Sequence, residues 1–113
     1  MNGVEGVLQA ALKGLSLRQR TIADNIANIE TPGFLAGRVD FETSLREATA
    51  AGRPSSTVPT VARSLEPTRL DGNNVNIDTE TVDAMQTNMR YELTVMALTN
   101  KFNGMRAAIG ARS

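Results

Sequence analysis

The last third of the chain, residues 79–109, is predicted to form one long helix with apolar residues on more than one side. From Tyr91 onward these residues alternate at intervals of four and three, which is the heptad spacing of a helix that needs a partner. A rod of about thirty residues is roughly 45 Å long and cannot fold back to cover itself. The first stripe consists of Tyr91, Val95, Leu98, Phe102, Met105 and Ile109, and the second of Val82, Met85, Met89, Leu93 and Met96.

A second long helix is predicted over residues 3–28, with Asn2 as its N-cap. Arg18 and Gln19 interrupt its apolar seam, and such a polar break weakens a seam but can fix its register. Gly14 in the interior costs about 1 kcal/mol relative to alanine, so this helix alone is marginal. The candidate seam positions are Leu8, Leu12, Leu15, Ile22, Ile26 and Ile29.

The middle of the chain begins with a turn at residues 31–33. Pro32 disfavours helical geometry at Thr31, and Gly33 permits a positive φ. A short helix is predicted from an N-cap at Asp40 to a point before Gly52. Phe41, Leu45 and Ala48 share one face of that helix.

Residues 53–70 contain three prolines among serines and threonines, which indicates an extended or loosely ordered linker. Its short alternating pieces can pair as strands if another segment offers an edge. Asp71-Gly72 is a turn signal, and Val75 and Ile77 alternate with polar residues, which predicts a small hairpin. We expect Asp78 to cap the C-terminal helix and Gly110 to end it.

The predicted fold class is therefore mainly α. Long N- and C-terminal helices pair as an antiparallel coiled coil, and the irregular middle holds a short helix and a small hairpin. We divide the chain into a terminal-helix domain, residues 1–30 and 72–113, and an extended middle segment, residues 31–71.

The composition argues against an enzyme. The chain has no cysteine and no histidine, so the commonest general base, metal ligand and thiol nucleophile are all missing. Twelve basic and twelve acidic residues cancel, which disfavours nucleic acid as a partner. Glu80 and Asp83 have the character of surface carboxylates. We predict no cofactor, no metal and no small-molecule substrate.

The N-terminus lacks the basic and apolar regions of a cleaved secretory signal, and no stretch is long enough for a membrane span. The main physical inference concerns the helices instead. Two paired helices bury one stripe each, and nothing in a two-helix hairpin covers the second stripe of the C-terminal helix. Exposed apolar area of that extent marks an interaction site. We therefore expect a structural protein that associates with itself or with partners.

Two blocks of the sequence resemble a known family. Residues 18–34 are similar to the N-terminal signature of bacterial flagellar rod and hook proteins, although Asp24 stands where asparagine is commoner. Residues 71–78, followed by Glu80, resemble the proximal-rod subunits of the same family. The motif positions are Asn25, Asn28, Thr31, Pro32, Gly33 and Phe34 in the first block, and Asp71, Gly72, Asn73, Asn74 and Val75 in the second.

The resemblance implies a subunit of the proximal rod of the flagellar basal body, a drive shaft in the periplasm. It implies assembly through the terminal helices, export by the flagellar type III apparatus without a cleaved signal peptide, and a middle segment that reaches adjacent subunits. The implied partners are other copies of the chain, other rod proteins, the FliE adaptor, the export gate and the inner-membrane ring. Asn25 and Asn28 are expected to cap or bridge backbone groups near the turn.

Two alternatives remain open. One is a sibling axial subunit of FlgC type, against which the second motif block argues. The other is a soluble helical adaptor that folds as a monomer or dimer, for which the helical ends alone would suffice.

Overall fold

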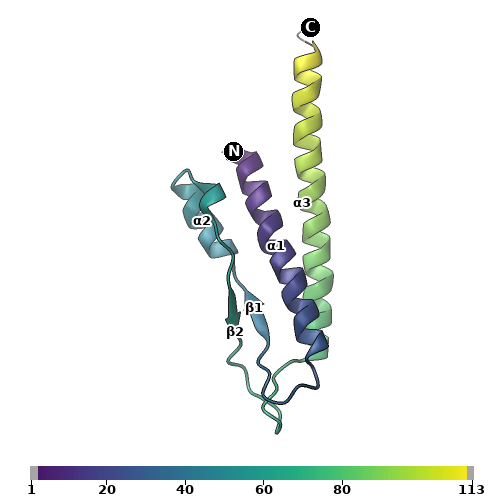
Figure 1. Ribbon diagram of the computed structural model, residues 1–113. Helices are drawn as coiled ribbons and strands as arrows, with labels where there is room; N and C mark the ends of the chain where they lie inside the picture. The colour runs from purple at the N-terminus through teal and green to yellow at the C-terminus, as the bar shows by residue number, and fades with distance from the viewer. Residues whose placement is uncertain (1–2, 112–113) are drawn as a thin grey trace.

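The computed structural model describes residues 3–111, so the predicted cap at Asn2 lies outside the described residues. Three helices and two short strands are connected by loops (Figure 1). The elements in chain order are α1 (Gly3–Ala27), β1 (Gly37–Val39), α2 (Glu42–Ala50), the 3₁₀ turn η1 (Pro54–Ser56), β2 (Val61–Arg63) and α3 (Ile77–Ala111).

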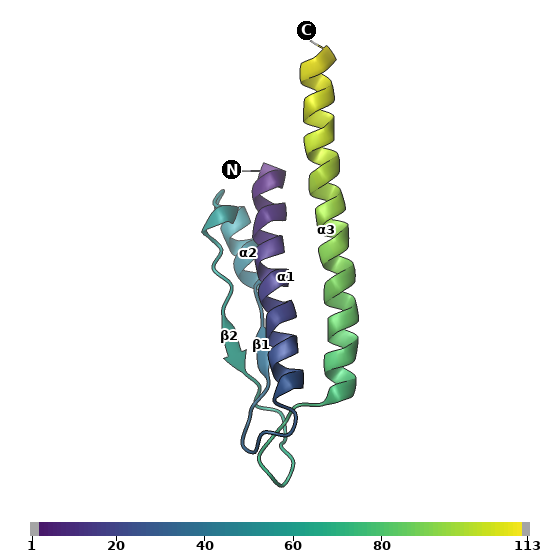
Figure 2. The same ribbon diagram turned by 45° about the vertical axis from the view of Figure 1, so that its right-hand side comes forward.

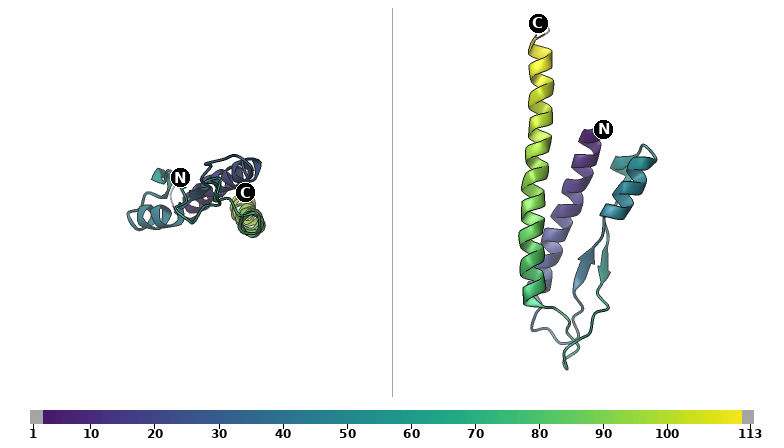
Figure 3. Two further views of the ribbon diagram at one scale, coloured as in Figure 1. Left: turned by 90° about the horizontal axis from the view of Figure 1, so that it is seen from below. Right: turned by 180° about the vertical axis from the view of Figure 1, so that it is seen from behind.

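The molecule is long and thin, with principal extents of 67, 27 and 14 Å. Helix α1 is central: α3 packs along one side, and β1, α2 and η1 pack along the other. The views in Figures 2 and 3 show the same order of elements from other directions. In Figure 1 α1 descends and α3 ascends, so the neighbouring helices are antiparallel, and the connecting loops gather at the lower end. We call this lower end the base.

Three polar contacts define the register between α1 and α3. Near the base, Asn25 Nδ2 donates to Glu80 Oε2 at 3.1 Å. Gln19 Nε2 donates to Asn88 Oδ1 at 2.9 Å, and at the other end Lys101 Nζ lies 3.9 Å from Glu5 Oε1. Because α1 begins at Gly3, the residues of α3 beyond about Asn103 have no part of α1 beside them.

The hydrophobic core lies mainly between α1 and the middle segment. Leu15, Val39 and Phe41 are buried together, and Ala11, Leu17, Leu45 and Tyr91 pack against them. Of the face expected for the short helix, Phe41 and Leu45 lie in this cluster, and Ala48 is half-buried. Only Tyr91 brings α3 into this cluster. The middle segment is thus part of the subunit's own core.

Gly14 is the position where α1 and Phe41 approach most closely. A Cβ atom added to Gly14 would lie 2.2 Å from Cγ of Phe41 and 2.3–2.5 Å from two further ring carbons. From the sequence, Gly14 was only a weak point of the helix. The structure shows that the missing side chain makes room for the aromatic ring.

The small antiparallel sheet is not where the sequence predicted a hairpin. Strands β1 and β2 pair with Gly37 opposite Arg63 and Val39 opposite Val61. The prediction of a hairpin across Asp71-Gly72 is wrong, although the turn itself exists, with Gly72 at φ 83°. The edge that the proline-rich segment needs is provided by β1, which no sequence signal indicated.

The predicted boundaries of α1 are close to those observed, whereas other caps differ. Asn76 caps α3, because its Oδ1 accepts from the backbone N–H groups of Asp78 and Thr79 at 2.9 and 3.3 Å. Asp78 therefore lies inside the first turn. Helix α3 continues through Gly110 to Ala111. At α2 the N-cap position is Phe41 without a side-chain hydrogen bond, and not Asp40.

The close approach at Gly14 predicts that Gly14→Ala destabilises the protein. Alanine gains about 1 kcal/mol of helix propensity, but overpacking against the Phe41 ring costs about 1–3 kcal/mol. Urea unfolding followed by circular dichroism measures the net loss. Gly104→Ala in α3 is the matched control, since open space surrounds that position. The control variant should gain stability, and an equal gain in Gly14→Ala would contradict the packing argument.

Candidate assembly interface

The base of the molecule is held by a fully buried polar junction. Asn25 Nδ2 donates to the Gly37 carbonyl at 3.0 Å, and its Oδ1 accepts from the Gly37 N–H at 2.8 Å. The same amide nitrogen donates to Glu80. One side chain of α1 thus satisfies both backbone groups of a strand residue and contacts α3. Asn25 thus bridges α1, β1 and α3, and its backbone partner is Gly37 of β1 and not the turn at residues 31–33.

Glu80 completes this junction and corrects a prediction. Its side chain is 0% exposed, and its Oε1 accepts from Arg38 Nη1 at 2.6 Å. The expectation of a surface carboxylate is therefore wrong. Removal of one partner from such a buried pair leaves a charge uncompensated, which is strongly destabilising. The pair thus fixes the first turns of α3 against β1.

Asn73 and Asn74 tie the two loops of the base together. Asn73 Nδ2 donates to the carbonyls of Asn28 and Thr31, both at 2.9 Å. Asn74 Oδ1 accepts from the Ala36 N–H at 2.7 Å, and its Nδ2 donates to two carbonyls of the loop after β2. Motif residues far apart in the sequence are therefore brought together by hydrogen bonds.

Two glycines allow these loops to touch. The Gly33 N–H donates to the Asp71 carbonyl at 2.8 Å, and a Cβ on Gly72 would lie 3.2 Å from the Cα of Gly33. Both glycines have positive φ. The loops can therefore cross only with glycine at both motif positions, because other residues rarely adopt a positive φ.

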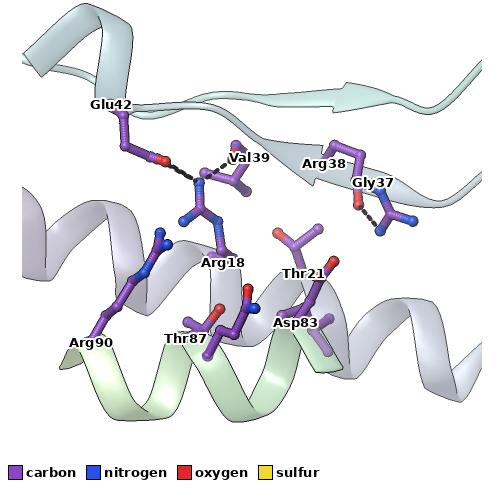
Figure 4. Close-up of a pocket in the computed structure, with 11 residues that line it drawn as sticks. Arg18, Thr21, Gly37, Arg38, Val39, Glu42, Asp83, Thr87 and Arg90 are labelled. Carbon is purple, nitrogen blue, oxygen red and sulfur yellow. Dashed lines mark hydrogen bonds and ion pairs between the residues drawn. The ribbon is translucent and has the colours of Figure 1, made fainter. Parts of the chain in front are cut away.

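A polar pocket of about 270 Å³ lies above the junction, between α1, β1 and α3 (Figure 4). Arg18 Nη2 donates to Glu42 at 2.6 Å and to the Val39 carbonyl, and its guanidinium lies over the Phe41 ring. The Thr21 hydroxyl donates to the backbone of its own helix. Arg18 thus joins α1 to β1 and α2, whereas the Thr21 hydroxyl is engaged within α1.

The outward face of α3 carries a row of exposed apolar side chains. The second stripe is uncovered, with exposed fractions between 52 and 68% for Val82, Met85, Met89, Leu93 and Met96. On the first stripe, Tyr91, Leu98 and Phe102 are half-buried, while Val95, Met105 and Ile109 are exposed. Glu80 and Thr87, which the sequence did not place on the seam, are buried beside α1.

The predicted seam of α1 does not face a single partner, because α3 and the middle segment pack on different sides of this helix. Leu15 and Ile22 are buried, Leu8, Leu12 and Ile29 are half-buried, and Ile26 is exposed. Small residues complete the buried side of the helix: Gly6, Ala10 and Gly14. A helix with partners on both sides buries more than one stripe. The closely spaced glycines and alanines of residues 6–14 were the available signal for a second contact.

The buried junction predicts a large effect of Asn25→Asp. The substitution removes the amide donor and places a second carboxylate beside Glu80, so we expect a loss of at least about 2 kcal/mol of unfolding free energy. Urea unfolding measures it. Asn100→Asp on the exposed surface of α3 should stay within about 0.5 kcal/mol of the parent. Equal stability of the two variants would contradict the assigned role of Asn25.

Comparison with known proteins first identifies the class of protein to which the chain is similar. A family model described as "Flagella basal body rod protein" matches residues 7–34, which contain most of α1 and the first motif block. Among curated relatives, the flagellar basal body rod protein FlgB of Escherichia coli (strain K12) is 30% identical, with 86% of each chain covered. FlgB of Borrelia hermsii is 34% identical over 84% of this chain and 87% of the relative, and FlgB of Bacillus subtilis (strain 168) is 27% identical over 90% and 89%.

The chain belongs to the FlgB family of flagellar basal-body rod proteins. It is a structural subunit of the proximal rod of the flagellar basal body, and it is not an enzyme. Within residues 3–111, no helix combines the length and apolar character needed to cross a membrane, and no cluster of acidic side chains suits a metal ion. The polar junction at the base holds the fold of the subunit together. The outward face of α3 is the candidate assembly surface.

Proposed function

We propose that the subunit assembles into the rod through its terminal helices, and that neighbouring subunits bury the outward face of α3. The observation that carries this proposal is the exposed second stripe. Five half-exposed side chains of this size would stabilise a contact by on the order of 5 kcal/mol before the costs of association. The other elements within residues 3–111 leave this surface open.

The geometry of α3 explains why the subunit cannot cover the stripe itself. Met89 and Leu98 are separated by about two and a half helical turns, so they point to opposite sides of the helix. Leu98 is on the side of α1 and is half-buried, whereas Met89 is exposed. The middle segment packs on the far side of α1 and does not reach the stripe. In the rod, we propose, α1 and α3 form an antiparallel coiled coil within the core layer, residues 1–30 and 72–113.

We further propose that the middle segment, residues 31–71, contacts neighbouring subunits. Although it packs on α1, it presents exposed apolar side chains outward, and these are Val58, Val61, Leu65 and Leu70. An apolar group on a loop gains stability only when another surface covers it. A dual use of this segment, inside the subunit and between subunits, fits both observations.

The remaining proposals concern location and partners. As a proximal-rod subunit, the chain is proposed to contact other rod proteins, the FliE adaptor, the export gate and the inner-membrane ring, in the periplasm. Membership of a family of flagellar basal-body rod proteins supports them. We also propose that the flagellar type III apparatus exports the chain without cleavage of its N-terminus.

The assembly proposal predicts that Met89→Asp blocks rod formation while the subunit still folds. Met89 is exposed, so a carboxylate there changes folding stability little but is unfavourable in an apolar interface. Swimming and the recovery of rods are measured in a flagellated strain whose own copy of the gene is deleted. Thr99→Asp, on the flank of α3, is the control. Normal swimming with Met89→Asp would overturn the role of the stripe.

The export proposal predicts that the chain reaches the rod with its N-terminus intact. Mass spectrometry of the subunit from isolated basal bodies should find the peptide that begins at Met1 or, after removal of methionine alone, at Asn2. A peptide that begins deeper inside α1 would show cleavage and contradict the proposal.

A further inference from the structure

The two ends of the molecule differ in shape and in charge. At the upper end α3 projects beyond α1 by about eight residues, 104–111, which is roughly 12 Å of helix. We call this segment the overhang. Its apolar residues continue the first stripe, because Leu98, Phe102, Met105 and Ile109 follow one another at heptad intervals. Below, α1 covers part of that stripe; on the overhang, Met105 and Ile109 are exposed.

The overhang is also cationic. No acidic residue follows Glu92 in the sequence, and Arg106 lies in the overhang, whereas Lys101 lies below it and approaches Glu5 of α1 at 3.9 Å. Arg106 donates only to the Asn103 side chain of its own helix, and no carboxylate accepts from it within the described residues. The end of α3 therefore presents two apolar side chains and a guanidinium without an ion pair.

The base has the complementary shape. A hollow of about 330 Å³ opens there, lined by Ile29, Pro67, Val75 and Ile77 among polar residues of the loop before α3. Ile77 is exposed at its edge, and the neighbouring Leu70 is fully exposed. Pockets that bind small ligands start at about 300 Å³, so the hollow is large enough for an apolar side chain.

The charge at the base is complementary as well. Glu30 and Asp78, which adjoin the hollow residues Ile29 and Ile77 in the sequence, are exposed. Within residues 3–111 neither carboxylate forms an ion pair. Arg69 also lines the hollow, but it is engaged there, because it donates to the Ile29 and Val75 carbonyls and lies 3.7 Å from Asp71. A cationic partner at the base would meet carboxylates that have no cation of their own.

We propose that the hollow at the base binds the C-terminal helix end of a neighbouring rod subunit, head to tail. The occupant is an axial subunit whose last helix ends as this one does, with apolar side chains on one face, a basic residue beside them and no carboxylate. Contacts between unlike ends are heterologous and generate open, rod-like assemblies instead of closed dimers. The inference rests on the proposed assembly function and adds the partner segment and the direction of the contact.

Site-specific photo-crosslinking in the rod tests this arrangement. A photoreactive amino acid replaces Ile77 in the full chain, which is expressed in the strain that lacks its own copy, and basal bodies are isolated and irradiated. Mass spectrometry should show Ile77 joined to the last helical turns of a rod subunit, of this chain or a sibling. The same probe at Val58, exposed on the middle segment, is the control and should give this product at least about tenfold less often. Joining of Ile77 to an N-terminal helix, a middle segment or a protein outside the rod would overturn the inference.

Reversal of charge gives a second and independent test. Asp78→Arg places a cation opposite the cationic helix end, and like charges across an interface disfavour binding, so the number of assembled rods should fall at least about tenfold. Asp78→Glu keeps the charge and should assemble normally. Circular dichroism of both purified variants verifies the helical fold. Normal assembly of a folded Asp78→Arg variant would overturn the charge pairing at the base.

An experiment with the unmodified chain distinguishes failure of this inference from failure of the proposed assembly function on which it rests. If this chain fails to restore swimming and is absent from basal bodies, the assembly proposal and the docking inference are both wrong. If it restores swimming while the Ile77 probe joins another segment, only the docking inference is wrong.

Discussion

The fold depends on one buried hydrogen-bonded junction, because it is the place where all three layers of the molecule meet. Asn25 from α1, Gly37 and Arg38 from β1, and Glu80 from α3 are joined there by direct hydrogen bonds. A protein only 14 Å thick has little apolar volume to hold its layers together. Directional polar contacts in a low-dielectric interior replace part of that volume, and each is costly to break.

Helix α1 is the true centre of the subunit, and α3 is a peripheral element with one face inward. The largest buried cluster joins α1 to the middle segment, with Phe41 set against Gly14. The buried residues of the fold therefore gather around α1, whereas the second stripe of α3 is exposed.

Much of the secondary structure could be predicted, because it depends on local signals. Heptad spacing gave both long helices, and Pro32-Gly33 and Asp71-Gly72 gave the turns. The exposed second stripe followed from counting faces on α3. The sheet could not be predicted in this way, because β1 has three residues and its partner β2 is distant in the chain. Glu80 shows the same limit: at the start of a helix a carboxylate has a sufficient local explanation, so nothing in the sequence revealed Arg38 and Asn25 as its partners.

The length of α3 gives the junction a mechanical consequence. At 1.5 Å per residue, its 35 residues form an arm about 52 Å long, so a tilt of 5° at the first turn would displace the far end by about 4–5 Å. Such a displacement is comparable to the size of a side chain and would take an apolar stripe out of contact with its neighbour. The hydrogen bonds of Asn25 and Glu80 thus help to fix the angle of α3 relative to the rest of the molecule. The accuracy of this angle determines how well surfaces tens of ångströms away can be aligned.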